Sequence, residues 1–443
     1  MFTYHLRLAL KSLRRTPVVA ALMIGAIGLG VGICITTLTV FRLMSGNPIQ
    51  DRNDVLYSVT LDSWDVQRPW DENRPELPPT ELTYADAMAL LESDIPTRKV
   101  AMHKSGFVVD PVHLEGAKPF LVESRMTTND FFPMFDVPFL YGGPWDESAD
   151  ENPQMVVVLS KETNEKAFGG ENSVGRTIEL GGRFGSREFT VVGVLDDWLP
   201  TPKFYDLNNG AFNPTEEVFA PLRLTRALEL GSHGNINCWK DEPIDSFRDF
   251  IGSECVWLQF WAELPTRESV PEFQAHIDNY VREQKKLGRF ERPLNNKLRQ
   301  PDEWLEINQV VRDDNRVLVG LAFMFLAVCL LNMIGLLLAK FLGTAPAVGL
   351  RRALGASRRA VFEQHIVEVG VIGLAGGVLG VAIAALGLLG VRQLYDNYEA
   401  LTRMDVTMGL VALLIAVVSG VLAGLYPTWR ICSVSPAAHL KTQ

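Results

Sequence analysis

Four long apolar stretches limit what this chain can fold into more than any other feature of its sequence. Each holds 21 to 25 residues with at most one strongly polar side chain; they cover 17–41, 317–339, 369–391 and 406–426. A helix rises about 1.5 Å per residue, so ~20 apolar residues cross a hydrocarbon layer ~30 Å thick. Core helices of soluble proteins are usually shorter and amphipathic. The sequence therefore predicts four transmembrane helices.

The first stretch could also be a cleaved signal peptide, because basic residues lead into it. The apolar region of a signal peptide has only ~7–15 residues, whereas Pro17–Phe41 has 25. We therefore interpret it as a retained membrane anchor. Residues 1–16 alternate apolar and basic positions at helical spacing. This pattern predicts an amphipathic helix that lies on the cytoplasmic membrane surface.

Lysine and arginine counts predict the orientation in the membrane. Residues 1–16 carry four basic and no acidic side chains, and 340–365 carry five basic against one acidic. Residues 42–316 hold 29 basic against 47 acidic side chains, and 392–405 hold two against three. Because basic loops stay inside, both termini, including the tail 427–443, and the 340–365 loop are expected in the cytoplasm. The 42–316 insertion and the 392–405 loop are expected outside.

The 275-residue insertion between the first two spans is predicted to be an α+β domain. Its strand-like runs are rich in β-branched residues, and two segments show helical spacing. The strand runs are 55–61, 155–159, 189–195, 218–224 and 255–264, and the helical segments are 84–91 and 270–287. We expect two interleaved subdomains, with 54–62 and 255–264 in one and 85–225 in the other. Residues 303–316 lack Gly and Pro, which predicts a helical stalk continuous with the second membrane helix, 317–339.

Only two of the five cysteines, Cys238 and Cys255, lie in the segment that we place outside. Disulfides form in oxidising compartments, and a bridge that closes this loop would contribute about 3 kcal/mol through chain entropy. The alternative is a pair of buried free thiols.

No catalytic, cofactor or metal site is apparent in the sequence. Residues Gly170–Thr177 nearly match the phosphate loop, but Arg176 replaces its lysine and a strand pattern follows where a helix is required. The seven histidines form no ligand pattern, and no G-x-S-x-G nucleophile motif occurs. The formal net charge of −10 disfavours a nucleic-acid partner. We therefore expect a protein that is not an enzyme.

The membrane spans carry almost no ionisable residues, unlike those of ion-driven transporters. Glu368 lies at the cytoplasmic start of the third span. Its carboxylate could pair with an arginine of 340–365, or it could simply be a charge at the helix N-terminus, where the helix dipole stabilises a carboxylate. Small residues recur four apart in the spans and allow helices to approach closely. They could pack helices of one chain or join two chains in a dimer, and the residues concerned are Gly28, Gly32, Gly373, Gly377 and Gly380.

Four passages resemble the permease subunits of MacB/FtsX-type ABC transporters. They are the basic lead 8–17, the 156–195 region with Gly169-Gly170 and Val174–Ile178, the 348–359 passage with Ile366–Glu368, and 424–440. The chain departs from the family pattern at Thr344–Ala347, where a charged lead is usual. By this resemblance, the passage after Ala347 docks on an ATPase. The residues that we assign to coupling are Gly349, Leu350, Arg351, Arg352, Leu354, Gly355, Arg358 and Arg359. Alternatively, the arginines only set the topology.

The resemblance implies a dimer of permeases, identical or not, over two ATPase subunits that bind ATP and Mg²⁺. ATP-driven motion would be relayed through the membrane to the outside domains and drive efflux, with a periplasmic adaptor and an outer-membrane channel as further partners beside membrane lipid. We expect no ATPase domain within this chain. The alternatives are an FtsX-like relay that controls a cell-wall hydrolase, a lipoprotein-extracting permease and, last, a membrane-anchored enzyme.

Overall fold

The computed structural model describes residues 2–111, 116–182, 185–310, 313–394 and 406–433. These residues form two compact units. We call Met1–Ser45 with Val311–Gln443 the membrane unit, and Gly46–Val310 the insert domain. Most of the predicted 392–405 loop and of the 427–443 tail lies outside the described residues.

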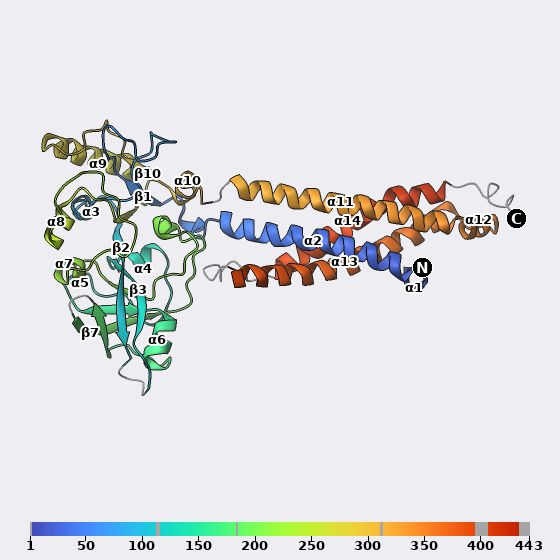
Figure 1. Cartoon of the computed structure of the whole chain (residues 1–443), viewed down its shortest axis with the longest axis horizontal. Helices are drawn as coiled ribbons and strands as arrows, with labels where there is room; N and C mark the ends of the chain where they lie inside the picture. The colour runs from blue at the N-terminus through green and yellow to red at the C-terminus, as the bar shows by residue number, and fades with distance from the viewer. Residues whose placement is uncertain (1, 112–115, 183–184, 311–312, 395–405, 434–443) are drawn as a thin grey trace. The chain divides into compact units, whose positions relative to one another are not determined.

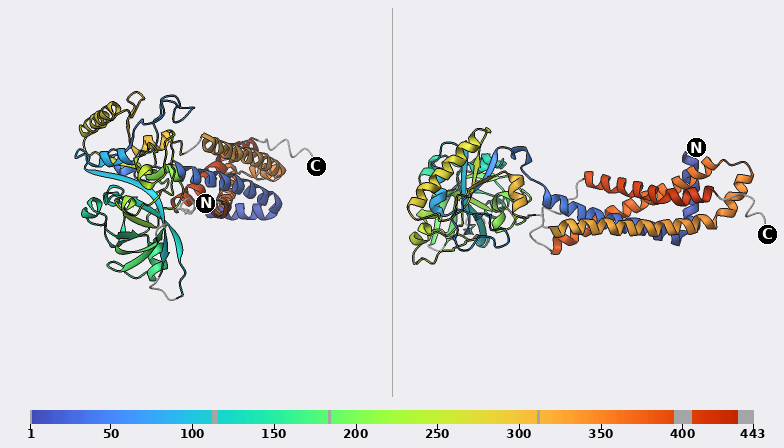
Figure 2. Two further views of the ribbon diagram at one scale, coloured as in Figure 1. Left: turned by 60° about the vertical axis from the view of Figure 1, so that its left-hand side comes forward. Right: turned by 90° about the horizontal axis from the view of Figure 1, so that it is seen from above.

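The membrane unit is a bundle of long helices, as Figure 1 shows. Four of its helices are long and apolar enough to cross a membrane, as the sequence predicts. Figure 2 shows the same helices side by side in a second direction. The helices are α1 (Phe2–Arg15), α2 (Pro17–Ser45), α11 (Asp313–Gly343), α12 (Ala345–Ala353), α13 (Arg358–Leu394) and α14 (Val406–Cys432).

Residues 340–365, the expected cytoplasmic loop between two spans, are mostly helical. Helix α11 continues to Gly343, α12 follows almost at once, and α13 begins at Arg358, well before the apolar stretch. Arg, Ala, Gln and Glu are good helix formers, so helix continues through polar sequence that a hydropathy argument assigns to a loop.

The predicted continuous stalk is also interrupted. Helix α10 (Pro301–Ile307) ends before α11 begins at Asp313. Trp304 of α10 is buried and its Nε1 donates to the Phe204 carbonyl oxygen at 3.1 Å, within the insert domain. Gln309 then adopts a positive φ of 50°, which a regular helix does not allow. Helix α10 is thus held by the insert domain's core and is not a continuation of the second membrane helix. Helix α2, in contrast, ends at Ser45, directly before Gly46 and Pro48, residue types that disfavour further helix.

The insert domain is built on one mixed sheet of ten strands in the order β10-β1-β9-β2-β3-β8-β5-β7-β4, with β6 paired to β2 and β7. The β3–β8 and β5–β7 pairs are parallel and the others antiparallel. The strands are β1 (Leu56–Thr60), β2 (Arg98–Asp110), β3 (Phe120–Thr127), β4 (Phe139–Gly142), β5 (Val156–Leu159), β6 (Thr177–Gly182), β7 (Gly185–Leu195), β8 (Val218–Pro221), β9 (Gln259–Glu263) and β10 (Lys297–Arg299).

Both faces of the sheet are covered, because successive side chains of a strand point to opposite faces. Phe260 of β9 belongs to one apolar core and its neighbour Trp261 to the other. The covering helices and 3-10 turns are η1 (Gln50–Arg52), α3 (Tyr84–Leu91), α4 (Phe131–Met134), α5 (Ser148–Glu151), α6 (Lys161–Phe168), η2 (Phe204–Asn209), α7 (Leu224–Ala227), α8 (Phe247–Gly252), α9 (Ser269–Lys286) and α10.

The α+β prediction is therefore confirmed, and the five strand runs and two helical segments each contain an element of the expected type. The two expected subdomains share one sheet. Strand β2 joins them, because one of its ends pairs with β9 and the other with β6.

The glycines of the small-residue pattern lie between helices of a single chain. A Cβ on Gly32 of α2 would lie 2.6 Å from Ile383 Cγ2 of α13 and 3.1 Å from the Gly380 carbonyl oxygen. Gly28 meets Leu379 of α13 in the same way, and Gly380 meets Val31 of α2. These contacts fix a close crossing of α2 and α13.

Gly373 and Gly377 make the equivalent contact between α13 and α14. A Cβ on Gly373 would lie 3.2 Å from the Ala416 carbonyl oxygen, and one on Gly377 would lie 2.9 Å from Ala416 Cβ. The intramolecular alternative thus accounts for all five glycines.

We predict that Gly32→Ala destabilises the bundle by about 1–3 kcal/mol, because α13 must move to admit the new methyl group. Gly25→Ala on the same helix is the matched control, since a Cβ there meets nothing within 4 Å. Thermal unfolding of the purified chain in detergent measures the difference. Unchanged unfolding with a loss of dimer would contradict the intramolecular assignment.

Candidate functional site

The candidate docking element is α12 with the turn into α13. Val348 and Gly349 are buried in the bundle, whereas Leu350 is 55% and Leu354 is 80% exposed. Gly355 ends the helix with a φ of 103°, a conformation that favours glycine. The hydroxyl of Ser357 then accepts the Ala360 amide at 3.2 Å and begins α13. The element therefore presents two leucines outward from a fixed helical base.

Exposed arginines surround these leucines. Arg351 Nη1 donates to Gln364 Oε1 at 3.2 Å, and Arg359 pairs with Glu363 at 2.9 Å. Arg358 is exposed as well. Arg352 turns inward, and its Nη1 donates to the Cys432 carbonyl oxygen at the end of α14 at 3.1 Å. An exposed apolar tip within a basic surface is typical of a contact site for another protein.

A buried ion pair anchors this end of the bundle. Lys340 Nζ of α11 lies 2.5 Å from Glu368 Oε1 of α13, and each side chain is only 3% exposed. Ser12 Oγ of α1 donates to the same carboxylate oxygen at 2.7 Å. One turn away, the His365 ring packs edge-on against Phe341, 4.5 Å between centroids. We call Ser12, Lys340 and Glu368 the base triad; it ties together three helices.

Neither alternative for Glu368 holds in the structure. Its partner is Lys340 and not an arginine of 340–365, and it does not lie at a helix N-terminus, because α13 already begins at Arg358. Because α11 stays helical to Gly343, Lys340 is held at the level of Glu368. The arginines follow on α12 and on the first turn of α13, farther along the chain.

The insert domain contains a second set of buried charges between its sheet and η2. Arg125 of β3 pairs with Asp206 and Glu216, and Lys203 Nζ lies 3.0 Å from Glu216 Oε1. The Tyr205 hydroxyl donates to Glu216 Oε2 at 2.9 Å. Burial alone would raise the pKa of Glu216, but Arg125 and Lys203 hold that pKa well below its ordinary value. The charges are therefore matched, as buried charges must be.

Glu81 lies at the edge of this cluster and is not matched by a cation. Gln259 Nε2 donates to Glu81 Oε1 at 2.8 Å, while Gln259 Oε1 accepts from Arg125 at 3.2 Å. Burial, and then the negative charge of Asp206, raise the pKa of Glu81 to about 8. Glu81 is therefore protonated at neutral pH.

The structure joins Cys238 and Cys255 by a disulfide. Asn237 and Val256, which flank the two cysteines, also form a β-bridge. The bridge closes the segment that carries α8 onto the edge of the core.

The segment that resembles a phosphate loop has a structural role. Helix α6 ends at Gly169, and residues 170–176 lead into strand β6, as the sequence predicts. The Gly175 amide donates to the Val191 carbonyl oxygen at 2.8 Å, so it is not available to a phosphate. Residues 170–176 form a connection into the β6–β7 hairpin.

Several features of these sites escaped the sequence analysis. Nothing in the composition marks Lys340 as the partner of Glu368, because the two lie 28 positions apart. The Arg125 cluster joins three segments that are distant in the sequence. Its one sequence signal is a charged residue inside a strand pattern: Lys104 in β2 and Glu123 and Arg125 in β3 interrupt the apolar alternation.

Four helices that can cross a membrane, among the residues that the structure describes, and a large inserted α+β domain are the architecture of a multi-pass membrane protein of the permease class. The MacB-like periplasmic core domain family matches residues 20–280, and the FtsX-like permease C-terminal family matches residues 319–436. The chain therefore belongs to the MacB/FtsX-like family of ABC transporter permeases.

Individual relatives are distant. The chain is 25% identical over 320 residues to the pyoverdine export ATP-binding/permease protein PvdT of Pseudomonas entomophila, covering 71% of this chain and 42% of that protein. It is 21% identical to the macrolide export ATP-binding/permease protein MacB of Syntrophobacter fumaroxidans, covering 71% and 46%. The chain thus spans less than half the length of these relatives. The crystal structure of the periplasmic region of MacB from Actinobacillus actinomycetemcomitans aligns with 60% of this chain and 96% of that region, at 12% identity and a TM-score of 0.37.

We predict that removing either charge of the base triad destabilises the bundle, because the remaining charge stays buried without a partner. Lys340→Met or Glu368→Gln should each cost about 3–5 kcal/mol, and the double variant much less than the sum. A double-mutant cycle from thermal unfolding of the detergent-solubilised chain measures the coupling. Strictly additive effects would show that the two side chains do not interact.

A second prediction concerns the pH dependence of insert-domain stability. Because the folded Glu81 keeps its proton up to about pH 8, the folded state binds more protons than the unfolded state between about pH 4.5 and 8, and stability falls as pH rises through this window. Glu81→Gln removes this loss, so the variant should equal the wild type near pH 4.5 and be more stable at pH 8.

Urea unfolding followed by tryptophan fluorescence suits this measurement, since eight of the nine tryptophans lie in 42–316. Glu188→Gln, an exposed change on β7, is the control and should leave the pH profile unaltered. Parallel profiles for the wild type and Glu81→Gln would contradict the assigned protonation.

Proposed function

We propose that this chain is the permease subunit of an ABC transporter that relays the ATP-driven motion of a separate ATPase to its insert domain. The relay drives export of a substrate across the cell envelope. The observation that carries the proposal is the docking element: exposed Leu350 and Leu354 among arginines, on a helix fixed to the bundle. An ATPase with an apolar groove and an acidic rim would fit this surface.

The base triad supports the relay. It joins α1, α11 and α13 directly beside the docking element, so a force on α12 reaches helix α11 without passing through a flexible loop. Helices α2 and α11 are the two that continue in sequence into the insert domain. Side chains buried between the helices are mostly apolar, among them Met23, Ile27 and Met333. Such a bundle suits transmission of motion better than conduction of a polar substrate.

The remaining parts of the proposal follow from the family. The leucines exposed on α11, α13 and α14 would contact lipid and a second permease subunit, identical or not. We place both termini and α12 in the cytoplasm and the insert domain in the periplasm of a bacterial inner membrane, where an adaptor and an outer-membrane channel would complete an export path. ATP and Mg²⁺ would bind the partner ATPase, and this chain would perform no hydrolysis.

The sharpest test removes the apolar tip of the docking element. Leu354→Asp should lower co-purification of the ATPase at least tenfold, because a carboxylate would enter an apolar contact. Leu287→Asp is the matched control, since Leu287 is 75% exposed in the insert domain. The thermal unfolding of both variants should equal that of the wild type.

Equal recovery of the ATPase with both variants would contradict docking through α12, and a wild-type chain that recovers no ATPase would contradict the proposal as a whole. A deletion strain separates the kinds of output. Failed cell separation with normal efflux would indicate control of a cell-wall hydrolase, and lipoproteins retained in the inner membrane would indicate lipoprotein extraction.

A further inference from the structure

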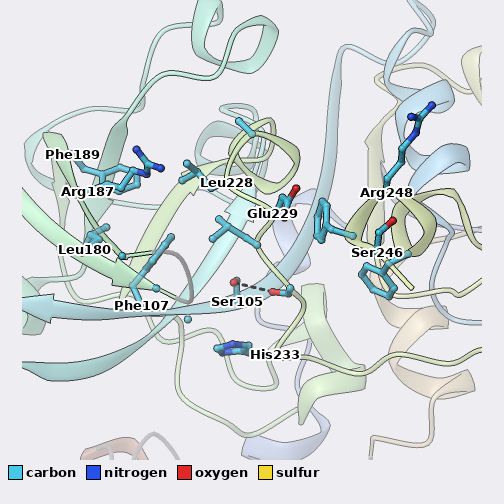
Figure 3. A pocket seen from close by; sticks show the side chains of 18 of the residues that line it. Ser105, Phe107, Leu180, Arg187, Phe189, Leu228, Glu229, His233, Ser246 and Arg248 are labelled. Carbon is cyan, nitrogen blue, oxygen red and sulfur yellow. Dashed lines mark hydrogen bonds between the residues drawn. The ribbon is translucent and has the colours of Figure 1, made fainter. Parts of the chain in front are cut away.

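The insert domain contains a cavity of about 870 Å³ whose residues have no part in the features described above. One wall is a single face of strands β2, β6 and β7. Leu180 of β6 lies opposite Arg187 of β7, and Phe189 lies two residues further along β7 on the same face. Phe107 of β2 joins this face. Figure 3 shows Phe107, Leu180 and Phe189 together with Arg187 at one end of the cavity.

The opposite wall comes from two segments that the sheet does not contain. Residues 227–231 follow α7, and residues 244–250 lead into and form most of α8. Leu228 and Phe250 contribute apolar surface, and Phe250 is itself stacked on the buried Trp257 at 4.9 Å. The Cys238–Cys255 bridge closes the chain on both sides of α8. The wall is therefore held in place before any ligand binds, which lowers the entropy cost of binding.

The size and lining of the cavity fit a small molecule. Ligand pockets generally measure about 300–1,000 Å³ and combine apolar walls with a few polar groups. Phe107, Leu180 and Phe189 are each at most 3% exposed, so they form the closed base of the cavity. The accessible apolar surface comes from the opposite wall, where Leu228, Phe247 and Phe250 are half-buried. The rings of Phe247 and Phe250 can pack against a flat ring in offset or edge-on contacts.

The charge at one end selects the ligand. Arg187 is exposed, and it takes part in no ion pair within the part of the chain that the structure describes. The two carboxylates of the lining belong to the opposite wall, because Glu229 follows α7 and Asp245 precedes α8, whereas Arg187 is on β7. Glu188 points to the other face of β7. A guanidinium beside an apolar wall favours a carboxylate, sulfonate or phosphate through two parallel hydrogen bonds.

We propose that this cavity is a binding site for amphipathic aromatic anions, with the ring body against Leu228, Phe247 and Phe250 and the anionic group on Arg187. The site goes beyond the proposed function and does not depend on it, since binding requires neither the ATPase nor nucleotide. A molecule captured here would be a candidate substrate or effector of the permease.

The test uses the full chain in nanodiscs of zwitterionic lipid, without ATPase or ATP, and empty nanodiscs as the blank. The probes are naphthalene-2-sulfonate and the cation of the same ring, 2-naphthyltrimethylammonium, titrated by calorimetry. We expect one saturable sulfonate site per chain and cation binding at least about tenfold weaker. Arg187→Ala should weaken sulfonate binding about tenfold, and Arg187→Lys should restore part of it.

Two further variants separate the cavity from general adhesion. Ala227→Trp fills the cavity from an exposed position and should abolish sulfonate binding. Arg267→Ala removes an exposed arginine outside the lining and should leave it unchanged. Equal binding of anion and cation, indifference to Ala227→Trp, or no saturable binding at millimolar probe would each overturn the proposal. A failure of ATPase docking would leave it standing, because the two measurements share no component.

Discussion

A lysine and a glutamate buried together at the end of a membrane bundle are the constraint on which the rest of the membrane unit depends. Two charges withdrawn from water are tolerable only when each satisfies the other at close range. Lys340 and Glu368 meet this condition at 2.5 Å, and Ser12 fills a further position on the carboxylate. The pair therefore fixes the relative height of α11 and α13, and this fixes α12 between them. The candidate docking element α12 is therefore held in place by this contact.

The close helix crossings act in the same direction. Gly32 and Gly380 let the backbones of α2 and α13 approach until a single methyl group would not fit. Such contacts resist sliding, because any shift opens a void or creates a clash. The insert domain has its own rigid element, in which Arg125 and Lys203 balance Asp206 and Glu216 beneath η2. Each unit thus contains a rigid element, which the proposed transmission of motion would require.

The sequence predicted the elements that depend on a local residue pattern, and few of the contacts between residues that are distant in the chain. Hydropathy identified the four spans, and alternation identified β7 and the core of β9. Hydropathy does not report helix propensity outside the apolar stretches. The sequence therefore did not reveal α12 and the start of α13 within the segment between two spans. The prediction of a continuous stalk was wrong because it rested on local sequence alone. Nothing in 303–316 shows that Trp304 donates a hydrogen bond to the Phe204 carbonyl oxygen, 100 residues away in the chain. The docking residues could be named from a family motif, whereas the Arg125 cluster and the cavity required coordinates.

Hydrogen–deuterium exchange of the assembled permease–ATPase complex, with and without a non-hydrolysable ATP analogue, tests the central claim most directly. A mechanical relay predicts that nucleotide changes the hydrogen–deuterium exchange of two insert-domain segments, 46–52 and 301–310, which are next to the membrane unit in the sequence. It also predicts that Lys340→Met abolishes this change while the ATPase still binds. Nucleotide-dependent exchange confined to the membrane unit, or an insert-domain response that survives loss of the Lys340–Glu368 pair, would contradict the account.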